Sequence, residues 1–145
     1  MIDDISIKSV IYNDKRKNIV FKENRSEYRA SNIEQKNVIA YKIDGCMIEN
    51  GNKCDNGLGI PEKRTLYLIE LKGCDVDHAC IQLDATIEFI KERISKDVCI
   101  KARIVASHVK PELFSTKYKA LSKKIKTINP NGDLISRTRL LEEEI

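Results

Sequence analysis

Three apolar, strand-like runs follow one another in the middle of the chain, and they restrict the fold more than any other feature of the sequence. Asn50-Gly51, a pair typical of a two-residue turn, separates the first run from the second, and the four residues PEKR separate the second from the third. Connections this short join antiparallel neighbours, so the pattern predicts three strands of one sheet. The runs are 37–48 (NVIAYKIDGCMI), 53–60 (KCDNGLGI) and 65–72 (TLYLIELK).

The spacing of the apolar residues changes from strand-like to helical after the third run. Apolar residues recur every three or four positions over 79–94, and Asp75 or Asp77 is available to cap this helix. An alternating run follows at 97–107 (DVCIKARIVAS), and a second helix is predicted after Pro111. The remaining elements are a turn at 129–133 (NPNGD) and a short strand at 134–139 (LISRTR).

The first 35 residues carry weaker signals. Ile5, Ile7, Val10 and Ile11 predict a short strand, whereas SEYRASNIEQ is polar and is compatible with a loop or a helix. The whole order is then three strands joined by hairpins, a helix, a strand and a helix. That order predicts an α/β or α+β fold with a mixed central sheet, and the 145 residues suit a single domain over 1–145.

Composition excludes several classes of protein. No apolar run is long enough to span a membrane, and the polar start MIDDISIKS does not resemble a signal peptide, so we expect a cytoplasmic protein. The five cysteines include no CxxC pair, and Cys74, His78 and Cys80 could form only a partial metal cluster, so we expect reduced thiols without structural zinc. The net charge of +4 is compatible with a nucleic-acid partner.

Two charges interrupt the third apolar run, and the register of the strands brings another charge beside them. If the loop between the second and third runs has four residues, Ile60 faces Thr65, and Asp55 then lies opposite Glu70. Lys72 points to the same face as Glu70, because it lies two residues further along the strand. Opposed carboxylates repel each other unless a cation lies between them. We therefore expect a metal site, since carboxylate, carbonyl and water oxygens are the ligands that magnesium takes.

Alternatives accompany this interpretation. Glu70 and Lys72 could belong to a solvated strand end whose alternation is merely polar, and a bulge at a glycine of the second run would shift the register. Asp44, in KIDGC, would lie on the same face if the Asn50-Gly51 turn forms, as a further acidic neighbour of the site. An aspartate at a strand end can equally bond backbone amides.

The sequence resembles the PD-(D/E)XK nuclease superfamily over residues 37–106. Asp55, then IELK with Glu70 and Lys72, then a helix, carry the resemblance together with the order of strands and helix. The resemblance implies a restriction-endonuclease-like fold in which Asp55, Glu70 and the backbone carbonyl of Leu71 hold one or two Mg²⁺ ions, with Mn²⁺ as a substitute. It also implies that Lys72 orients the attacking water and stabilises charge on the phosphate.

The sequence also departs from the pattern of the superfamily. Cys54 stands where the name of the motif has a proline. Gln82, in the following helix, stands where several members carry a glutamine, but Thr86 stands where the exonuclease type has a tyrosine. Members often place a glutamate in an N-terminal helix, and Glu23 and Glu27 are both candidates for it.

Two functions follow from the resemblance. The first is a Mg²⁺-dependent nuclease that hydrolyses phosphodiester bonds of nucleic acid, with DNA favoured as the substrate. The second is a catalytically inactive nuclease-fold protein that binds nucleic acid or another protein. In both cases a chain of 145 residues leaves little room for target recognition, so we expect a homodimer or a larger complex.

A third function, unrelated to nucleases, is that of a basic domain whose second helix contacts phosphates. The lysine-rich face of that helix is more often only a solvated surface. Its lysines are Lys117, Lys119, Lys123, Lys124 and Lys126.

Overall fold

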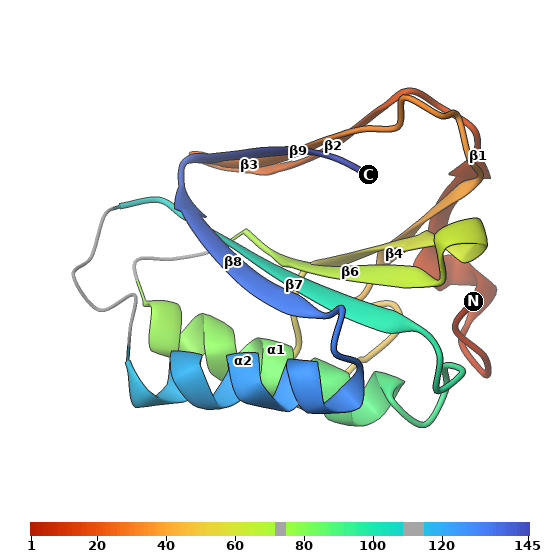
Figure 1. Ribbon diagram of the computed structural model, residues 1–145. Helices are drawn as coiled ribbons and strands as arrows, with labels where there is room; N and C mark the ends of the chain where they lie inside the picture. Colours follow the sequence, from red (N-terminus) through yellow and green to blue (C-terminus); the bar gives the residue numbers. More distant parts are fainter. Residues whose placement is uncertain (72–74, 109–114) are drawn as a thin grey trace.

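The computed structural model describes residues 1–71, 75–108 and 115–145, and these residues form a large sheet, a small sheet and two α-helices (Figure 1). The large sheet has six strands in the order β1-β4-β5-β6-β7-β8, and the small sheet has three in the order β2-β3-β9. The helices cover one face of the large sheet, and the small sheet lies over the other face.

The strands of the large sheet are β1 (Val10–Asp14), β4 (Val38–Lys42), β5 (Asn56–Ile60), β6 (Thr65–Glu70), β7 (Cys99–Ala106) and β8 (Asp133–Thr138). Those of the small sheet are β2 (Asn18–Glu23), β3 (Ser26–Ser31) and β9 (Leu140–Glu144). The helices are α1 (Val76–Ile90) and α2 (Thr116–Ile128), and the short 3₁₀ helices are η1 (Ile7–Ser9) and η2 (Pro61–Lys63).

β6 is buried along its whole length because it lies between two apolar layers. Leu66 and Leu68 belong to the core beneath the helices, which includes Leu83 of α1, whereas Tyr67 and Ile69 belong to the core beneath the small sheet. A strand covered on both faces has no need for a polar alternation. This explains why the sequence of β6 is a nearly continuous apolar run.

The order of elements predicted from the sequence is confirmed from β4 to α2. β4, β5 and β6 are antiparallel and β7 is parallel to β6, so the large sheet is mixed and the fold is of the α+β kind. α1 is capped by Asp75, whose side chain accepts a hydrogen bond from the His78 N–H at 3.1 Å. The helix ends at Ile90, one turn earlier than the apolar spacing predicts.

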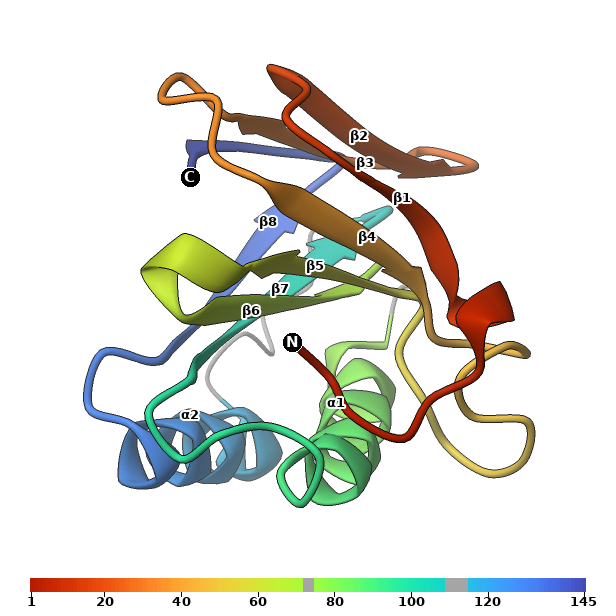
Figure 2. The same cartoon turned by 90° about the vertical axis from the view of Figure 1, so that its right-hand side faces the viewer.

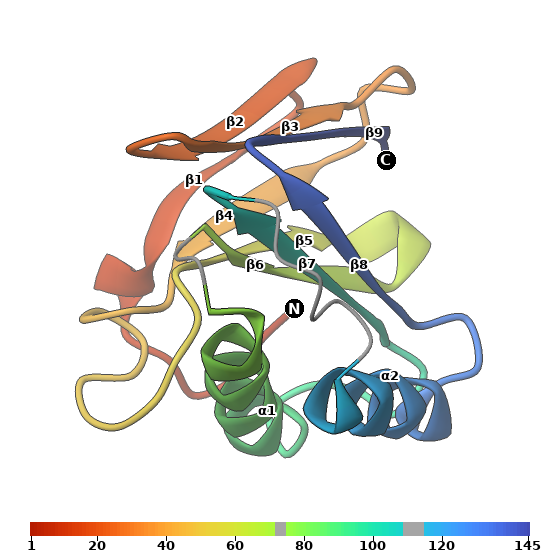
Figure 3. The same ribbon diagram turned by 90° about the vertical axis from the view of Figure 1, so that its left-hand side faces the viewer.

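The carboxyl ends of three parallel strands and the amino-terminal ends of both helices lie at the same end of the large sheet. β6, β7 and β8 run parallel, and α1 and α2 are the crossovers that join them in turn. Figure 3 looks at this end of the sheet, with the amino-terminal ends of both helices toward the viewer. In open sheets with parallel strands, ligands usually bind outside the carboxyl ends of the strands. A site is therefore expected first at this end of the sheet, beside the carboxyl ends of β6, β7 and β8.

The predicted two-residue turn at Asn50-Gly51 is wrong. β4 and β5 pair antiparallel as expected, but residues 43–55 lie between them as a long connection. Gly51 does adopt a left-handed φ of 86°, so the pair makes a bend inside the connection without pairing the strands. The connection is anchored to α1 near its end, where the Cys54 N–H donates a hydrogen bond to the Thr86 hydroxyl at 2.8 Å.

The N-terminal segment forms strands, although its sequence is equally compatible with a loop or a helix. SEYRAS is β3, in which Ser26, Tyr28 and Ala30 are buried between more exposed neighbours. β2 pairs with β3 antiparallel and β9 pairs with it parallel, and the sequence analysis predicts neither β2 nor β9. Figure 2 shows the chain passing from β1 in the large sheet to β2 in the small one.

The expectation of an N-terminal helix with a site glutamate is wrong for both candidates. Glu23 ends β2 and Glu27 lies in β3, close to the hairpin that joins these strands. The side chain of Glu27 forms an ion pair with Arg29 at 3.2 Å. Both glutamates thus belong to the small sheet.

A buried arginine ties the small sheet to the large one. The Arg103 side chain, in β7, is 3% exposed, and its Nε donates to both carboxylate oxygens of Glu143 in β9, at 3.0 and 2.9 Å. Its Nη1 donates to Asp133 of β8, and the Tyr28 hydroxyl of β3 donates to Glu143. Burial lowers the pKa of Arg103, but the two carboxylates outweigh this effect and the net shift is upward. The guanidinium is therefore charged and links four strands.

Candidate functional site

The pairing of β5 with β6 places Asp55 and Glu70 where the sequence predicts them. Ile60 pairs with Thr65 and Asn56 with Ile69, as a four-residue connection requires. Asp55 precedes Asn56 and Glu70 follows Ile69, so the same register places Asp55 opposite Glu70. The two carboxylates therefore come from neighbouring strands at one end of the sheet.

Both carboxylates are on the helix side of the large sheet. Glu70 follows Leu66 and Leu68 on alternate positions, and these leucines belong to the core beneath the helices. Both acidic residues are largely buried, with Asp55 4% exposed and Glu70 0%. The alternative of a solvated strand end is therefore wrong for Glu70.

Backbone amides and the Asp55 carboxylate hold this end of the strand pair together. The Leu71 N–H donates to Asp55 Oδ2 at 2.8 Å, which brings the Asp55 carboxylate against the residue that follows Glu70. The Asp55 carbonyl accepts from the N–H groups of Ile43 and Asp44, at 3.1 and 3.4 Å. Asp55 is thus fixed through both its side chain and its main chain.

Cys54, which precedes Asp55 in the chain, carries a buried thiol. Burial raises the pKa of the Cys54 thiol, and the charges of Glu70 and then Asp55 raise it further. The thiol is therefore neutral and does not compete with the carboxylates as an anionic ligand. The donor atoms that the structure brings together here are the oxygens of the two carboxylates. Such a set suits a hard divalent cation such as Mg²⁺.

Thr86 is a positioning residue that the sequence analysis missed. Its hydroxyl accepts the Cys54 N–H at 2.8 Å and donates to the Gln82 carbonyl at 2.8 Å, and its side chain is fully buried. This bond fixes the main chain one residue before Asp55. The signal available in the sequence was a threonine on the apolar face of a helix, which can satisfy a buried backbone donor.

We expect Thr86→Val to release this anchor. The substitution keeps the shape but leaves the buried Cys54 N–H without its acceptor, which should lower the free energy of unfolding by about 1–3 kcal/mol. Amide hydrogen exchange distinguishes this effect from a general loss of packing. The Cys54 amide should lose protection in Thr86→Val and keep it in Thr86→Ser, which retains the hydroxyl. Equal protection in the two variants would contradict the role given to Thr86.

The remaining predicted site residues have different positions. Asp44 lies in the long connection, where its carboxylate pairs with Lys53 at 3.6 Å and its N–H bonds the Asp55 carbonyl. The turn that was to bring its side chain to the site does not form, and it instead bonds Asp55 through the backbone. Gln82 is half-buried on α1, one turn before Thr86. Lys72 lies outside the described residues.

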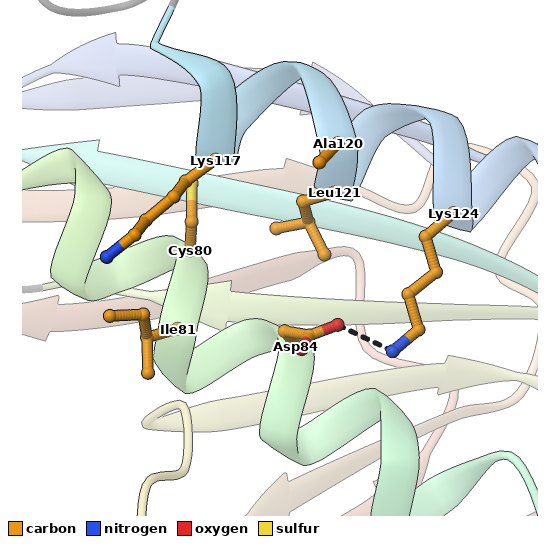
Figure 4. A pocket seen from close by; sticks show the side chains of 7 residues that line it. All are labelled: Cys80, Ile81, Asp84, Lys117, Ala120, Leu121 and Lys124. Atoms are coloured by element: carbon orange, nitrogen blue, oxygen red, sulfur yellow. Dashed lines mark hydrogen bonds and ion pairs between the residues drawn. The ribbon is translucent and has the colours of Figure 1, made fainter.

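A surface hollow near the helices is separate from the two carboxylates. It has a volume of about 400 Å³ and lies between α1 and α2, and neither Asp55 nor Glu70 lines it. Figure 4 shows Lys117 and Lys124 of α2 beside this hollow, with Asp84 of α1 joined to Lys124. The candidate site is therefore defined by the strand pairing and not by this hollow.

The described residues give three further findings. No group of three or more His, Cys, Asp and Glu side chains suited to a metal ion occurs in 1–71, 75–108 and 115–145. Cys46, Cys54, Cys80 and Cys99 are free thiols. Within the same residues, no helix is both long enough and apolar enough to cross a membrane.

Comparisons with known proteins add no family to this description. No protein-family model, no curated protein and no solved structure matches the chain. What the chain does must therefore be argued from its own residues.

Proposed function

We propose that the protein is a divalent-metal-dependent nuclease that hydrolyses phosphodiester bonds of nucleic acid, with DNA as the favoured substrate. The observation that supports the proposal is the opposition of Asp55 and Glu70 on the helix side of β5 and β6. Two largely buried carboxylates at opposed positions repel each other, and holding a divalent cation is a purpose that would offset this repulsion. The resemblance of Asp55 and the IELK segment to the PD-(D/E)XK nucleases supplies that purpose.

Each residue has a distinct role in this proposal. Asp55 and Glu70 would hold Mg²⁺ together with the Leu71 carbonyl, and the Leu71 N–H keeps the Asp55 carboxylate in place. Lys72 would position the attacking water and stabilise negative charge on the phosphate. Mg²⁺, when bound, lowers the pKa of water and offsets the charge that develops on the phosphate. Gln82 is proposed as a supporting residue in the helix behind the site.

The proposed partner is nucleic acid, and we further propose that the protein acts as a homodimer or in a larger complex. The full burial of Glu70 favours a second function, a nuclease-fold protein that binds nucleic acid or a protein without cleaving it. A carboxylate with no exposed surface reaches a substrate only if neighbouring segments move. Cleavage and metal binding separate the two functions.

The test is a cleavage assay combined with calorimetry. Single-stranded, duplex and branched DNA and RNA are incubated with Mg²⁺ or Mn²⁺, and an EDTA control is run for each substrate. We expect cleavage of at least one DNA substrate that EDTA abolishes, and a heat of Mg²⁺ or Mn²⁺ binding that Asp55→Ala removes. If no substrate is cut and neither ion binds, the nuclease proposal fails and the binding function remains.

A further inference from the structure

The lysines of α2 divide into two groups with different surroundings. Lys124 faces α1, where its Nζ donates to Asp84 Oδ1 at 2.6 Å and also forms an ion pair with Glu88 (Figure 4). Hydrogen bonds to Lys124 and Lys91 lower the pKa of Glu88 to about 2. Lys124 therefore joins the two helices, and its charge is matched by acidic neighbours.

The second group, the outer lysines, consists of Lys119, Lys123 and Lys126. All three are exposed, and together with the Tyr118, Ser122 and Thr127 side chains they line a shallow hollow of about 550 Å³. No carboxylate lines this hollow, and within the described part of the chain none of the three forms an ion pair with an acidic residue. The outer lysines thus form a basic surface without acidic neighbours of its own.

The opposite face of α2 holds this surface in a fixed orientation. Leu121 and Ile125 are buried against the large sheet, and the Tyr118 hydroxyl donates to the Leu134 carbonyl of β8 at 3.2 Å. The helix cannot rotate without breaking these contacts. Its lysines are therefore presented to solvent as a row on a rigid support.

The dimensions of the row suit the backbone of a nucleic-acid strand. Lys119 and Lys126 are seven residues apart, which is about 10 Å along a helix that rises 1.5 Å per residue. One strand of a duplex carries about three phosphates over that length of its axis, at one per 3.4 Å. The Ser122 hydroxyl, between Lys119 and Lys123, adds a donor for a phosphate oxygen, whereas the Thr127 hydroxyl already donates to the Lys123 carbonyl at 2.9 Å.

We infer that the outer lysines, with Ser122, are the surface on which the sugar-phosphate backbone of nucleic acid docks. This inference rests on the proposed function in taking nucleic acid as the partner. It adds the place of contact. The row of lysines begins at the same end of the large sheet as the candidate site, because α2 begins there (Figure 3). A bilayer is a poorer partner, because the apolar side chains Leu121 and Ile125 of α2 are buried against the sheet, and Tyr118, the aromatic side chain of the hollow, is tied to the Leu134 carbonyl.

The test measures binding without cleavage. Fluorescence anisotropy with labelled single-stranded and duplex DNA is run in EDTA on the full chain and on the triple variant Lys119→Gln, Lys123→Gln, Lys126→Gln. We expect binding weaker by on the order of a hundredfold at 0.1 M salt. The slope of log K against log salt should become shallower by two to three, at about one per lost lysine–phosphate contact.

A second triple variant controls for net charge. Lys15→Gln, Lys17→Gln, Lys22→Gln removes the same charge from exposed positions at the other end of the molecule, around β2 (Figure 1). This variant should bind DNA nearly as well as the wild type and keep the salt slope. Lys124→Gln should lower stability, since it breaks the contacts to α1, but should not change the salt slope.

Several results would overturn the inference. One is equal weakening by the two triple variants, since binding would then follow net charge and not this surface. Another is binding of an acidic protein or of anionic vesicles, but not of DNA, through the same lysines. The two proposals can fail separately: localised DNA binding without any cleavage removes only the nuclease, whereas cleavage that is unaffected by the triple variant removes only the docking surface.

Discussion

Glu70→Gln and Asp55→Asn should each lower the rate of metal-dependent DNA cleavage by about a hundredfold or more. Each substitution keeps the size of the side chain and replaces a charged oxygen ligand by an amide, which holds Mg²⁺ more weakly. Calorimetry should therefore show a lower Mg²⁺ and Mn²⁺ affinity in both variants. Lys72→Ala, at a position outside the described residues, should lose rate by a similar factor while still binding metal and DNA.

A matched substitution on the surface separates this effect from a general loss of charge. Glu92→Gln changes an exposed glutamate just after α1 in the same chemical way, and it should retain the full rate and the full metal affinity. Circular dichroism should show all variants folded under the assay conditions. Wild-type rates in Glu70→Gln would exclude Glu70 from the chemistry, even if the protein were a nuclease.

The second large effect concerns stability. Arg103→Ala should lower the free energy of unfolding by about 3–5 kcal/mol, because it removes the cation from a buried ion pair and leaves Glu143 without it. Urea denaturation measures the difference. Arg103→Lys should recover only part of the loss, since an ammonium cannot reproduce the fork that contacts both Glu143 oxygens and Asp133.

Two further variants define the source of this loss. The double variant Arg103→Met, Glu143→Gln should be more stable than Arg103→Met alone, because it also removes the charge of Glu143, while the more exposed Asp133 loses Arg103 in both variants. Arg137→Ala, at an exposed position of neighbouring β8, should change the free energy of unfolding by no more than about 0.5 kcal/mol. A loss below about 1 kcal/mol for Arg103→Ala would mean that the two sheets hold together without this network.

The central part of the fold could be predicted because its signals are local. PEKR is a short connection whose proline opens a 3₁₀ turn, so the register of Ile60 with Thr65 could be counted from the sequence. That count also predicts the opposition of Asp55 and Glu70, which is the basis of the candidate site. The Asn50-Gly51 signal is equally local, but there the chain only bends, and residues 43–55 form a long connection that bonds α1 through Cys54 and Thr86.

The small sheet could not be predicted because its signals are weak and its partners are distant. In β3 the buried positions include Ser26 and Ala30, whose side chains give little apolar contrast with their neighbours. β9 has the sequence LLEEE, and Leu141 is its one buried residue. It forms a strand by pairing with β3, which is distant in the chain. Thr86 is a similar case, since a threonine on a helix does not reveal which amide it bonds.

The parallel pairing of β3 with β9 has a consequence for the order in which the protein folds. Tyr28 and Glu143, which bond across these strands, are 115 positions apart in the chain. Closing a loop of that length costs more entropy than closing the β5–β6 hairpin, and contacts of long sequence separation slow folding. On a ribosome, β2 and β3 emerge early but lack this neighbour until β9 follows. The small sheet is therefore the part most exposed to mispairing during synthesis, when the open edge of β3 is available to other strands.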